Sequence, residues 1–214
     1  MRPILLVGGA PRVNVDAVRF ISVAASGATA LHVKECLQHQ GLSADLLLGI
    51  DASPTAPAQR YVDRQGLDSA LKHWITVNPT GVVMMSAAVN DYQVVQVAIE
   101  GAGAEGRTVV AVGTKLPSRA GAVTIRLEPA SKLIEQLRAW GLSGPIVGFK
   151  YEARDTVLAS AEALRQRVSA ALVVANSICG QVQALVDERG SQRFPDRPAL
   201  IEALGARLAL FARR

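Results

Sequence analysis

Aromatic residues are scarce in this chain of 214 residues: Phe, Trp and Tyr together make up only 4%, and charged residues 19%. Apolar residues nevertheless reach 50%, so the core must be built mainly from Ala, Val and Leu. This balance excludes an intrinsically disordered chain, which would combine few apolar residues with a high charge. The length suffices for one sizeable core, and we expect residues 1–214 to form a single domain.

Cysteine is also rare, because only Cys36 and Cys179 occur, and they lie far apart in the chain. This argues against a zinc site and a disulfide framework, and favours reduced thiols in a cytoplasmic protein. The N-terminal MRPILLVGGAP has too short an apolar run for a secretory signal. No uninterrupted apolar run approaches the roughly 18 residues of a membrane span, so we expect none.

A concentrated basic segment is missing as well, although the net charge is +5 and the pI about 9.6. The excess comes from arginines scattered along the chain, without a basic run interleaved with aromatics. This distribution argues against nucleic-acid binding. It suits anionic small molecules such as nucleotides or phosphate esters.

Buried strands and helices alternate along the chain. Apolar runs predict strands at 4–7, 44–49, 81–88, 145–149 and 171–175, and helical spacing predicts helices at 28–40, 67–76, 131–140, 155–170 and 198–213. The stretch at 51–58 carries two prolines and is expected to be a surface loop. Alternation of this kind predicts an α/β fold with a parallel sheet and right-handed crossovers.

Residues 94–125 break this alternation with short β-like runs separated by glycine-rich turns. They predict an antiparallel excursion, or flap, from the main sheet. Lys115 lies on one of its turns, exposed enough to reach a ligand. A lone loop lysine is more often simply solvated, and the pattern alone favours that interpretation over a ligand contact.

The first 27 residues combine an apolar strand with two glycine-containing turns. Gly8 and Gly9 follow the strand, and Ser26 and Gly27 precede the first helix. Glycine lets backbone N–H groups approach a ligand closely, and the start of a helix favours an anion. The spacing is neither Gly-x-Gly-x-x-Gly nor a Walker loop. A nucleotide-binding loop and an ordinary strand-to-helix turn therefore both remain open.

Further polar and aromatic residues follow the predicted strands. Ala87 and Ala88 lead to Asp91, the fourth strand delivers Phe149 and Lys150, and the fifth ends at Asn176, so these side chains should share one cleft. There is no Ser or Cys nucleophile with a partner His, and no His/Asp/Glu cluster for a tightly held metal. The pattern favours chemistry that places two substrates together and neutralises charge.

Five segments, in order between residues 4 and 176, resemble motifs of the phosphopantothenoylcysteine synthetase (phosphopantothenate cysteine ligase) family. Gly8 to Gly27 resembles a GGT-type loop followed by an aspartate, V-R-[FY]-I-x-N and S-S-G. The remaining four resemble A-A-V-[AS]-D-[YF] at 87–92, K-[IL] at 115–116, F-K-x-E-T at 148–152 and V-V-A-N at 173–176. Each motif is short, but their common order makes the match specific.

The resemblance implies a Rossmann-like fold, with a parallel sheet, helices on both faces and a small antiparallel flap near 94–125 used for dimerisation. It implies a homodimeric ligase that couples 4′-phosphopantothenate to cysteine in coenzyme A biosynthesis. Such enzymes activate the carboxylate as an acyl nucleotidylate with ATP or CTP and Mg²⁺, and the cysteine amine then displaces the nucleotide. The chain has no flavodoxin-like decarboxylase half, so we expect a stand-alone ligase or one that depends on a partner for that step.

Residue roles carry over position by position. The resemblance implies that Asp91 and Lys115 are catalytic, and that the acyl substrate contacts Ala87, Ala88, Asp91 and the position of Val23. The residues implied for the nucleotide are Gly8, Gly9, Ser26, Gly27, Lys115, Phe149, Lys150 and Asn176. The F-K-x-E form resembles the ATP-using branch of the family more than the CTP-using one, which favours ATP.

Val23 is the main departure, because the family has an asparagine there. Valine cannot make the hydrogen bonds of an amide, and one such contact is worth on the order of 100-fold in rate. A non-catalytic or regulatory paralogue that binds nucleotide or phosphopantothenate is therefore the alternative. A third hypothesis, an NAD(P)-dependent oxidoreductase, is disfavoured because the glycine fingerprint and an acidic residue closing the second strand are missing.

Overall fold

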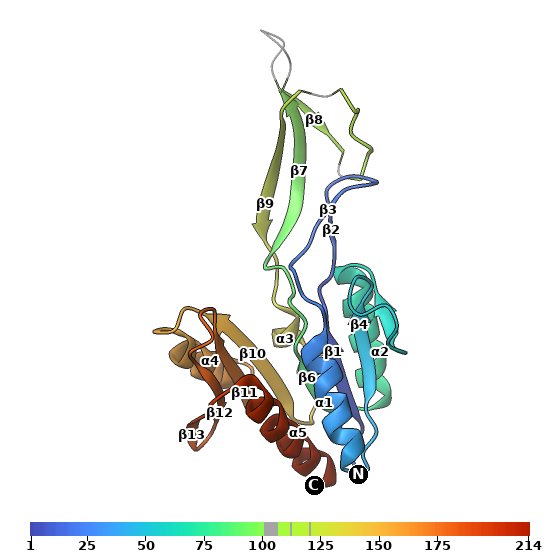
Figure 1. The fold of residues 1–214 in the computed structure, drawn as a ribbon. Helices are drawn as coiled ribbons and strands as arrows, with labels where there is room; N and C mark the ends of the chain where they lie inside the picture. The colour runs from blue at the N-terminus through green and yellow to red at the C-terminus, as the bar shows by residue number, and fades with distance from the viewer. Residues whose placement is uncertain (101–106, 112, 120) are drawn as a thin grey trace.

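The computed structural model describes residues 1–100, 107–111, 113–119 and 121–214, and its centre is an eight-stranded sheet (Figure 1). Across the sheet the strands are β13 (Gly190–Arg193), β12 (Gln183–Asp187), β11 (Leu172–Ser177), β10 (Ile146–Glu152), β6 (Val82–Met85), β1 (Ile4–Gly8), β4 (Asp45–Gly49) and β5 (Gln59–Tyr61). From β11 to β5 all neighbours are parallel, whereas β12 and β13 continue as an antiparallel hairpin. The predicted α/β parallel sheet is confirmed.

The chain leaves β1 in two opposite directions across the sheet. β4 and β5 lie on one side of β1, whereas β6, β10 and β11 follow on the other side. Where the strand order reverses in such a sheet, a crevice opens outside the carboxyl ends of the strands, and ligands bind there. A ligand site is therefore expected at the carboxyl ends of β1 and β6.

Helices cover both faces of the sheet. α1 (Ala28–His39) and α5 (Arg197–Arg213) pack on one face, and α2 (Arg64–Val77), α3 (Leu133–Gln136) and α4 (Val157–Arg167) on the other. Successive strand residues alternate between the two cores: Leu5 and Val7 join the α2/α4 side, Ile4 and Leu6 the α1/α5 side. Because both faces are covered, the strands read as continuous apolar runs.

Helices α1 and α5 approach each other closely at one glycine. A Cβ atom added to Gly205 in α5 would lie 2.8 Å from Cys36 Cβ in α1. No side chain fits there without displacement, which accounts for glycine inside a helix that is otherwise rich in Leu and Ala. This contact sets how closely the two helices can lie on the sheet.

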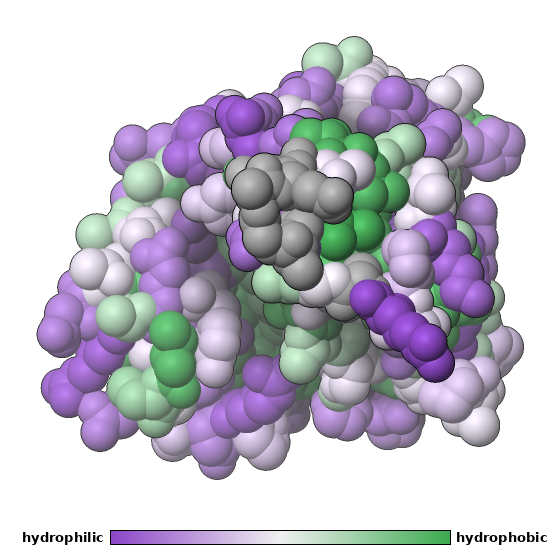
Figure 2. Space-filling model, turned by 90° about the horizontal axis from the view of Figure 1, so that it is seen from above, coloured by the Kyte–Doolittle hydropathy of each residue, from purple (hydrophilic) through white to green (hydrophobic). Residues whose placement is uncertain are grey.

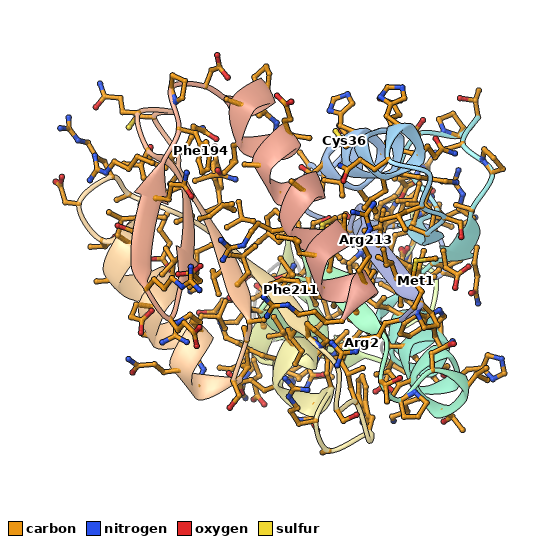
Figure 3. The ribbon with its side chains drawn as sticks, turned by 90° about the horizontal axis from the view of Figure 1, so that it is seen from below. Met1, Arg2, Cys36, Phe194, Phe211 and Arg213 are labelled. Carbon is orange, nitrogen blue, oxygen red and sulfur yellow. The ribbon has the colours of Figure 1, made fainter. Side chains whose placement is uncertain are left out.

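The two ends of the chain lie side by side at the end of the molecule opposite the projecting strands (Figure 1). The backbone N–H of Arg2 donates to the Ala212 carbonyl at 2.7 Å, and the Arg2 guanidinium donates to the Phe211 carbonyl at 3.4 Å. Figure 3 shows Arg2 and Phe211 together at the C-terminal end of α5. The negative end of the helix dipole also stabilises a cation at this position.

A three-stranded antiparallel sheet, the arm, projects from the body between β6 and α3 (Figure 1). It consists of β7 (Tyr92–Glu100), β8 (Arg107–Val110) and β9 (Val123–Pro129). At its base Tyr92 pairs with Pro129, and the Ala130 N–H donates to the Asp91 carbonyl at 2.8 Å. The excursion predicted for 94–125 is confirmed, although residues 101–106, which connect β7 to β8, and residues 112 and 120 lie outside the described residues.

A short hairpin, β2 (Val13–Asn14) with β3 (Phe20–Ile21), packs against the arm. Its turn contains Asp16, whose side chain is buried and accepts hydrogen bonds from Val18 N at 2.8 Å, Arg19 N at 2.6 Å and Leu116 N at 3.1 Å. Burial alone would raise the pKa of Asp16, but the N–H donors of Arg19, Leu116 and Val18 outweigh it and hold that pKa well below its usual range. One carboxylate thus joins the hairpin to the loop that follows β8.

Four elements differ from the predictions. The hairpin β2–β3 and the edge strand β5 were not predicted, because two- and three-residue strands leave no periodic pattern. The helix predicted for 131–140 contains only α3 and then continues as turns to Gly141. The loop at 51–58 is confirmed, and the Arg60 guanidinium fixes it by donating to its carbonyls at 2.6–2.8 Å.

Hydrophobic side chains are exposed at the end of the molecule that carries the arm. Figure 2, which looks down on this end, shows a group of hydrophobic residues there. The exposed large hydrophobic residues of the arm and the hairpin are Tyr92, Val95, Val109, Val123, Leu127, Val18 and Phe20. Such a concentration of exposed hydrophobic side chains on neighbouring strands marks a candidate interaction surface.

Candidate functional site

A cavity of about 590 Å³ opens at the carboxyl ends of β6, β10 and β11, beside the reversal of strand order. Its wall contains residues at the carboxyl end of each of these strands, the segment that follows β6, and residues of the α2, α3 and α4 region. The lining residues are Val23, Ala24, Arg64, Met85, Ser86, Ala87, Ala88, Val89, Asp91, Lys132, Leu133, Ile134, Phe149, Lys150, Tyr151, Glu152, Leu164, Arg167 and Asn176. The size suits a ligand larger than a single amino acid.

The chain after β6 is held over the end of β1 by backbone hydrogen bonds. The Ser86 N–H and hydroxyl donate to the Val7 carbonyl at 2.9 and 2.6 Å, and the Ala88 N–H donates to the Gly9 carbonyl at 2.9 Å. These bonds place Ala87 and Ala88 in the cavity wall. Small side chains here leave room for a ligand next to the backbone.

Asp91 is exposed at the base of the arm and lines the cavity. Its carboxylate faces the Lys132 ammonium at 3.5 Å, so the two charges lie on either side of the point where the arm joins the body. The pair is long and solvated, and a ligand can separate it at little cost. Asp91 is therefore available to a substrate.

β10 supplies an aromatic side chain and an ion pair to the cavity. Phe149 is half-buried, and Lys150 donates to the Glu152 carboxylate at 2.8 Å. Hydrogen bonds from Lys150 and Ser160 lower the pKa of Glu152, which is therefore ionised at neutral pH. An aromatic face beside a lysine suits a planar base that carries phosphates.

Asn176, at the end of β11, carries a buried acceptor that the protein does not satisfy. Within the described residues its Oδ1 atom has no hydrogen-bond partner, and neither has Oε1 of Gln183, which lies opposite on β12. Buried polar atoms are rarely left unpaired, so this oxygen is free to accept a hydrogen bond from a ligand. An amino group on a nucleotide base would satisfy it.

The structure brings Val23 and the residues after β6, β10 and β11 together, but it places the first glycine motif differently. Gly8, Gly9, Ser26 and Gly27 surround the start of α1 and do not line this cavity. A Cβ on Gly8 would lie 2.9 Å from Ala30 Cβ, and one on Gly9 would lie 2.9 Å from Gly49 N. These glycines allow close packing of β1 against α1 and β4. Gly9 and Gly27 also have positive φ angles, which glycine accepts readily.

Lys115 lies in the loop after β8, on the arm, and is exposed outside the cavity. The neighbouring Leu116 is buried in the small core between arm and hairpin, and its N–H donates to Asp16. The loop is therefore anchored on one side of Lys115. The structure does not bring this lysine together with the other predicted site residues.

Three basic residues of the cavity were not predicted from the sequence: Arg64, Lys132 and Arg167. Arg64 opens α2, Lys132 precedes α3 and Arg167 ends α4. All three lie at helix ends, whereas the residues predicted for the cleft lie at strand ends. Pro129 and Ser131, which mark the start of the predicted helix at 131–140, were the sequence signal near Lys132.

In the parts of the chain that the structure describes, no group of three or more His, Cys, Asp or Glu residues could hold a metal ion. None of the helices in those parts has both the length and the apolar character that a membrane crossing requires.

Comparison with known proteins adds a family and several related folds. Residues 1–194 match the family described as DFP, the DNA/pantothenate metabolism flavoprotein C-terminal domain. The coenzyme A biosynthesis bifunctional protein CoaBC of Thermococcus kodakarensis is 23% identical over 181 residues, which cover 82% of this chain and 41% of that protein. The chain thus spans about two fifths of the length of this relative.

Solved structures share the fold at low sequence identity. The DNA/pantothenate metabolism flavoprotein from Streptococcus pneumoniae gives a TM-score of 0.81 at 18% identity, covering 99% of this chain and 100% of that chain. The C-terminal domain of a CoaBC protein gives 0.73 at 18% identity, covering 100% and 97%. A variant of Cab2 in complex with phosphopantothenate-cysteine gives 0.76 at 14% identity, covering 98% and 85%.

Proposed function

Because the chain belongs to the family of DNA/pantothenate metabolism flavoprotein C-terminal domains, we propose that it is a nucleotide-dependent amide ligase of coenzyme A biosynthesis. It joins 4′-phosphopantothenate, or a related acid, to the amine of cysteine in the cytoplasm. The observation that carries this proposal is the cavity itself, whose wall combines Ala87, Ala88, Asp91, Phe149 and Asn176. These residues belong to three separate motifs, and the fold brings them to one place.

The reaction proceeds through an acyl nucleotidylate. A carboxylate oxygen of the acid attacks the α-phosphorus of ATP or CTP, and pyrophosphate leaves. The cysteine nitrogen then forms a bond to the acyl carbon as the nucleoside monophosphate leaves and the nitrogen releases a proton. Both steps need alignment of two reactants and neutralisation of phosphate charge, which a cavity lined by cations provides.

The nucleotide fits the part of the cavity near β10 and β11. Phe149 offers a face to the base, the unpaired Asn176 oxygen accepts from its amino group, and Lys150 neutralises phosphate charge. Gly8, Gly9, Ser26 and Gly27 would act at the start of α1, where backbone N–H groups favour an anion.

Magnesium would be held largely by the phosphates, with Asp91 and Glu152 as the carboxylates of the cavity wall. The ion supplies charge neutralisation on the triphosphate when it is bound. The described residues of the cavity wall offer these two carboxylates, and not the three or more side chains that would hold a metal ion without the nucleotide.

A homodimer formed through the arm is part of the proposal. The arm exposes apolar side chains on all three strands, and it carries Lys115 outside the cavity of its own chain. A role for Lys115 near the phosphates requires the arm to approach a cavity, either its own or that of a second copy.

A non-catalytic paralogue that binds nucleotide or phosphopantothenate is the second candidate. The observation that favours it is Val23, which is 43% exposed in the cavity wall and offers no hydrogen bond to an intermediate. Calorimetric binding of nucleotide or phosphopantothenate without turnover would support this candidate.

Release of pyrophosphate from phosphopantothenate, cysteine and ATP or CTP with Mg²⁺ tests the ligase. We expect release with wild type and a fall of about 100-fold in Asn176→Ala, with little change in Arg154→Ala outside the cavity. We expect Val23→Asn to raise the rate, since it restores a hydrogen-bonding side chain. Absence of release with both nucleotides, from a folded wild-type protein, overturns the proposal.

A further inference from the structure

Four cationic side chains line the cavity, and they differ in whether a carboxylate neutralises them. Three are paired: Lys150 with Glu152 at 2.8 Å, Lys132 with Asp91 at 3.5 Å, and Arg167 with Glu135 at 2.8 Å. Among the described residues, no carboxylate lies within ion-pair distance of the fourth, Arg64. Among the described residues that line the cavity, Arg64 is therefore the cation without an ion-pair partner.

The guanidinium of Arg64 is anchored at one end only. Its Nη2 atom donates to the carbonyl of Ser131 and, at 3.2 Å, to the hydroxyl of the same residue. In the described part of the chain, Nε and Nη1 have no acceptor. A guanidinium has five N–H groups in a rigid plane, so this one keeps donors free on its other side.

The two carboxylates whose charges act on Arg64 are each paired with another cation. Asp68 bonds to Lys72 at 2.6 Å, and Asp91 faces Lys132. Burial lowers the pKa of Arg64, and the charges of Asp68 and Asp91 act in the opposite direction. The guanidinium is thus partly removed from water and close to Asp91. A partly dehydrated, unneutralised cation attracts an anion more strongly than one on an open surface.

We propose that Arg64 binds the anionic end group of the acid substrate, namely the phosphate of 4′-phosphopantothenate or an equivalent phosphate. This inference rests on the proposed function, because Arg64 lies near Asp91, on the side where Ala87, Ala88 and Asp91 would hold the acid. The free edge of the guanidinium matches two phosphate oxygens. Arg64 would then select phosphorylated acids over unphosphorylated ones.

A purely structural role is the competing explanation, since Arg64 also ties the start of α2 to Ser131. Loss of such a tie would weaken binding of every ligand of the cavity and lower the melting temperature. Selectivity between two acids that differ only by a phosphate separates the two roles. Arg167 provides the matched control, because it lines the same cavity but is paired with Glu135.

Calorimetric titration of the full chain with 4′-phosphopantothenate and with pantothenate tests the inference. In Arg64→Gln we expect the affinity for the phosphorylated acid to fall about 10- to 100-fold, and that for pantothenate to stay the same. Arg64→Lys should lose less, because it keeps the charge but not the planar fork. Arg167→Gln should retain the preference for the phosphorylated acid.

Two results overturn the inference: Arg64→Gln that binds the phosphorylated acid as wild type does, or that loses both acids equally. If wild type binds neither acid, the proposed substrate is wrong, and inorganic phosphate becomes the probe. Arg64 then keeps its assignment as an anion-binding residue if phosphate raises the melting temperature of wild type but not of Arg64→Gln. It loses that assignment if both proteins respond alike.

Discussion

A single carboxylate, Asp16, holds together two segments that are 100 residues apart in the chain. Its two oxygens receive N–H groups of Val18, Arg19 and Leu116, and Arg19 adds its guanidinium. All of these partners are donors, so the site requires a group that only accepts. Asparagine has nearly the same shape, but its amide nitrogen would face donors.

We predict that Asp16→Asn lowers stability at neutral pH, measured as the urea midpoint. Because the pKa of Asp16 is lowered by folding, the ionised carboxylate stabilises the native state above the unfolded pKa of about 4. That contribution declines as the pH falls below this value. The difference in midpoint between wild type and variant should therefore narrow from pH 7 to pH 3.

Asp155→Asn, in an exposed position, serves as the control and should differ little from wild type at either pH. A difference between wild type and Asp16→Asn that stays constant down to pH 3 would contradict the assigned role of the carboxylate.

Residues that follow strands were predictable, whereas residues at helix ends were not. Asp91, Phe149, Lys150 and Asn176 come directly after or within apolar runs, and all four line the cavity. Arg64 sits in a sequence without a motif, and its position depends on how α2 meets the segment before α3. That meeting is a tertiary contact, which no local pattern encodes.

At the scale of elements, the contact between α1 and α5 depends on a residue without a side chain. We predict that Gly205→Val lowers the free energy of unfolding by about 1–3 kcal/mol, because the new Cβ would lie 2.8 Å from Cys36 Cβ. For a chain of this size, this corresponds to a fall in melting temperature of a few degrees, on the order of 2–4 °C per kcal/mol. Thermal unfolding followed by circular dichroism measures it.

Ala206→Val introduces the same side chain one position later in α5, where residue 206 is exposed. We expect a loss of about 0.5 kcal/mol or less, as helix propensity alone dictates. Equal losses in the two variants would show that the close approach of the helices is not limiting.

Long buried strands and helices were predictable because apolar runs and helical spacing are strong signals. The short strands β2, β3 and β5 were not predicted, because two or three residues show no periodic pattern. Their pairing depends on neighbouring segments: Arg60 in β5, for example, donates to carbonyls of the loop at 51–58. α3 is shorter than the predicted helix. It lies in the connection between β9 and β10, where packing of Leu133 and Leu137 into the core determines the path of the chain.

At the scale of the whole molecule, the exposed apolar residues of the arm predict self-association. We expect wild type to form a dimer in sedimentation velocity experiments, and Val109→Glu to raise the dimer dissociation constant about tenfold or more. Val109 is 58% exposed on β8, and a buried unpaired carboxylate at an interface is costly.

Val77→Glu, at the end of α2 and away from the arm, replaces a valine that is 66% exposed and should leave the dimer unchanged. A wild type that remains monomeric at about 100 μM, near the weak end of specific association, would refute the arm as a dimer interface. Equal weakening by both variants would place the interface elsewhere.

The motif resemblance to phosphopantothenoylcysteine synthetases is confirmed by the family match over residues 1–194. The assembly of the site was less predictable. Gly8, Gly9 and Gly27 read as a ligand loop in the sequence, yet their close contacts are with Ala30, Gly49 and Ala52. The sequence alone does not distinguish a glycine required by packing from a glycine required by a ligand.

The arm leaves and re-enters the body at one point, where the Asp91 carbonyl accepts from Ala130 N–H and the Asp91 carboxylate faces Lys132. A rotation of the arm relative to the body would therefore be centred on residues of the cavity wall. A small tilt of the long strands β7 and β9 would change the separation of these two charges first. We therefore expect a ligand that separates Asp91 from Lys132 to change the orientation of the arm as well.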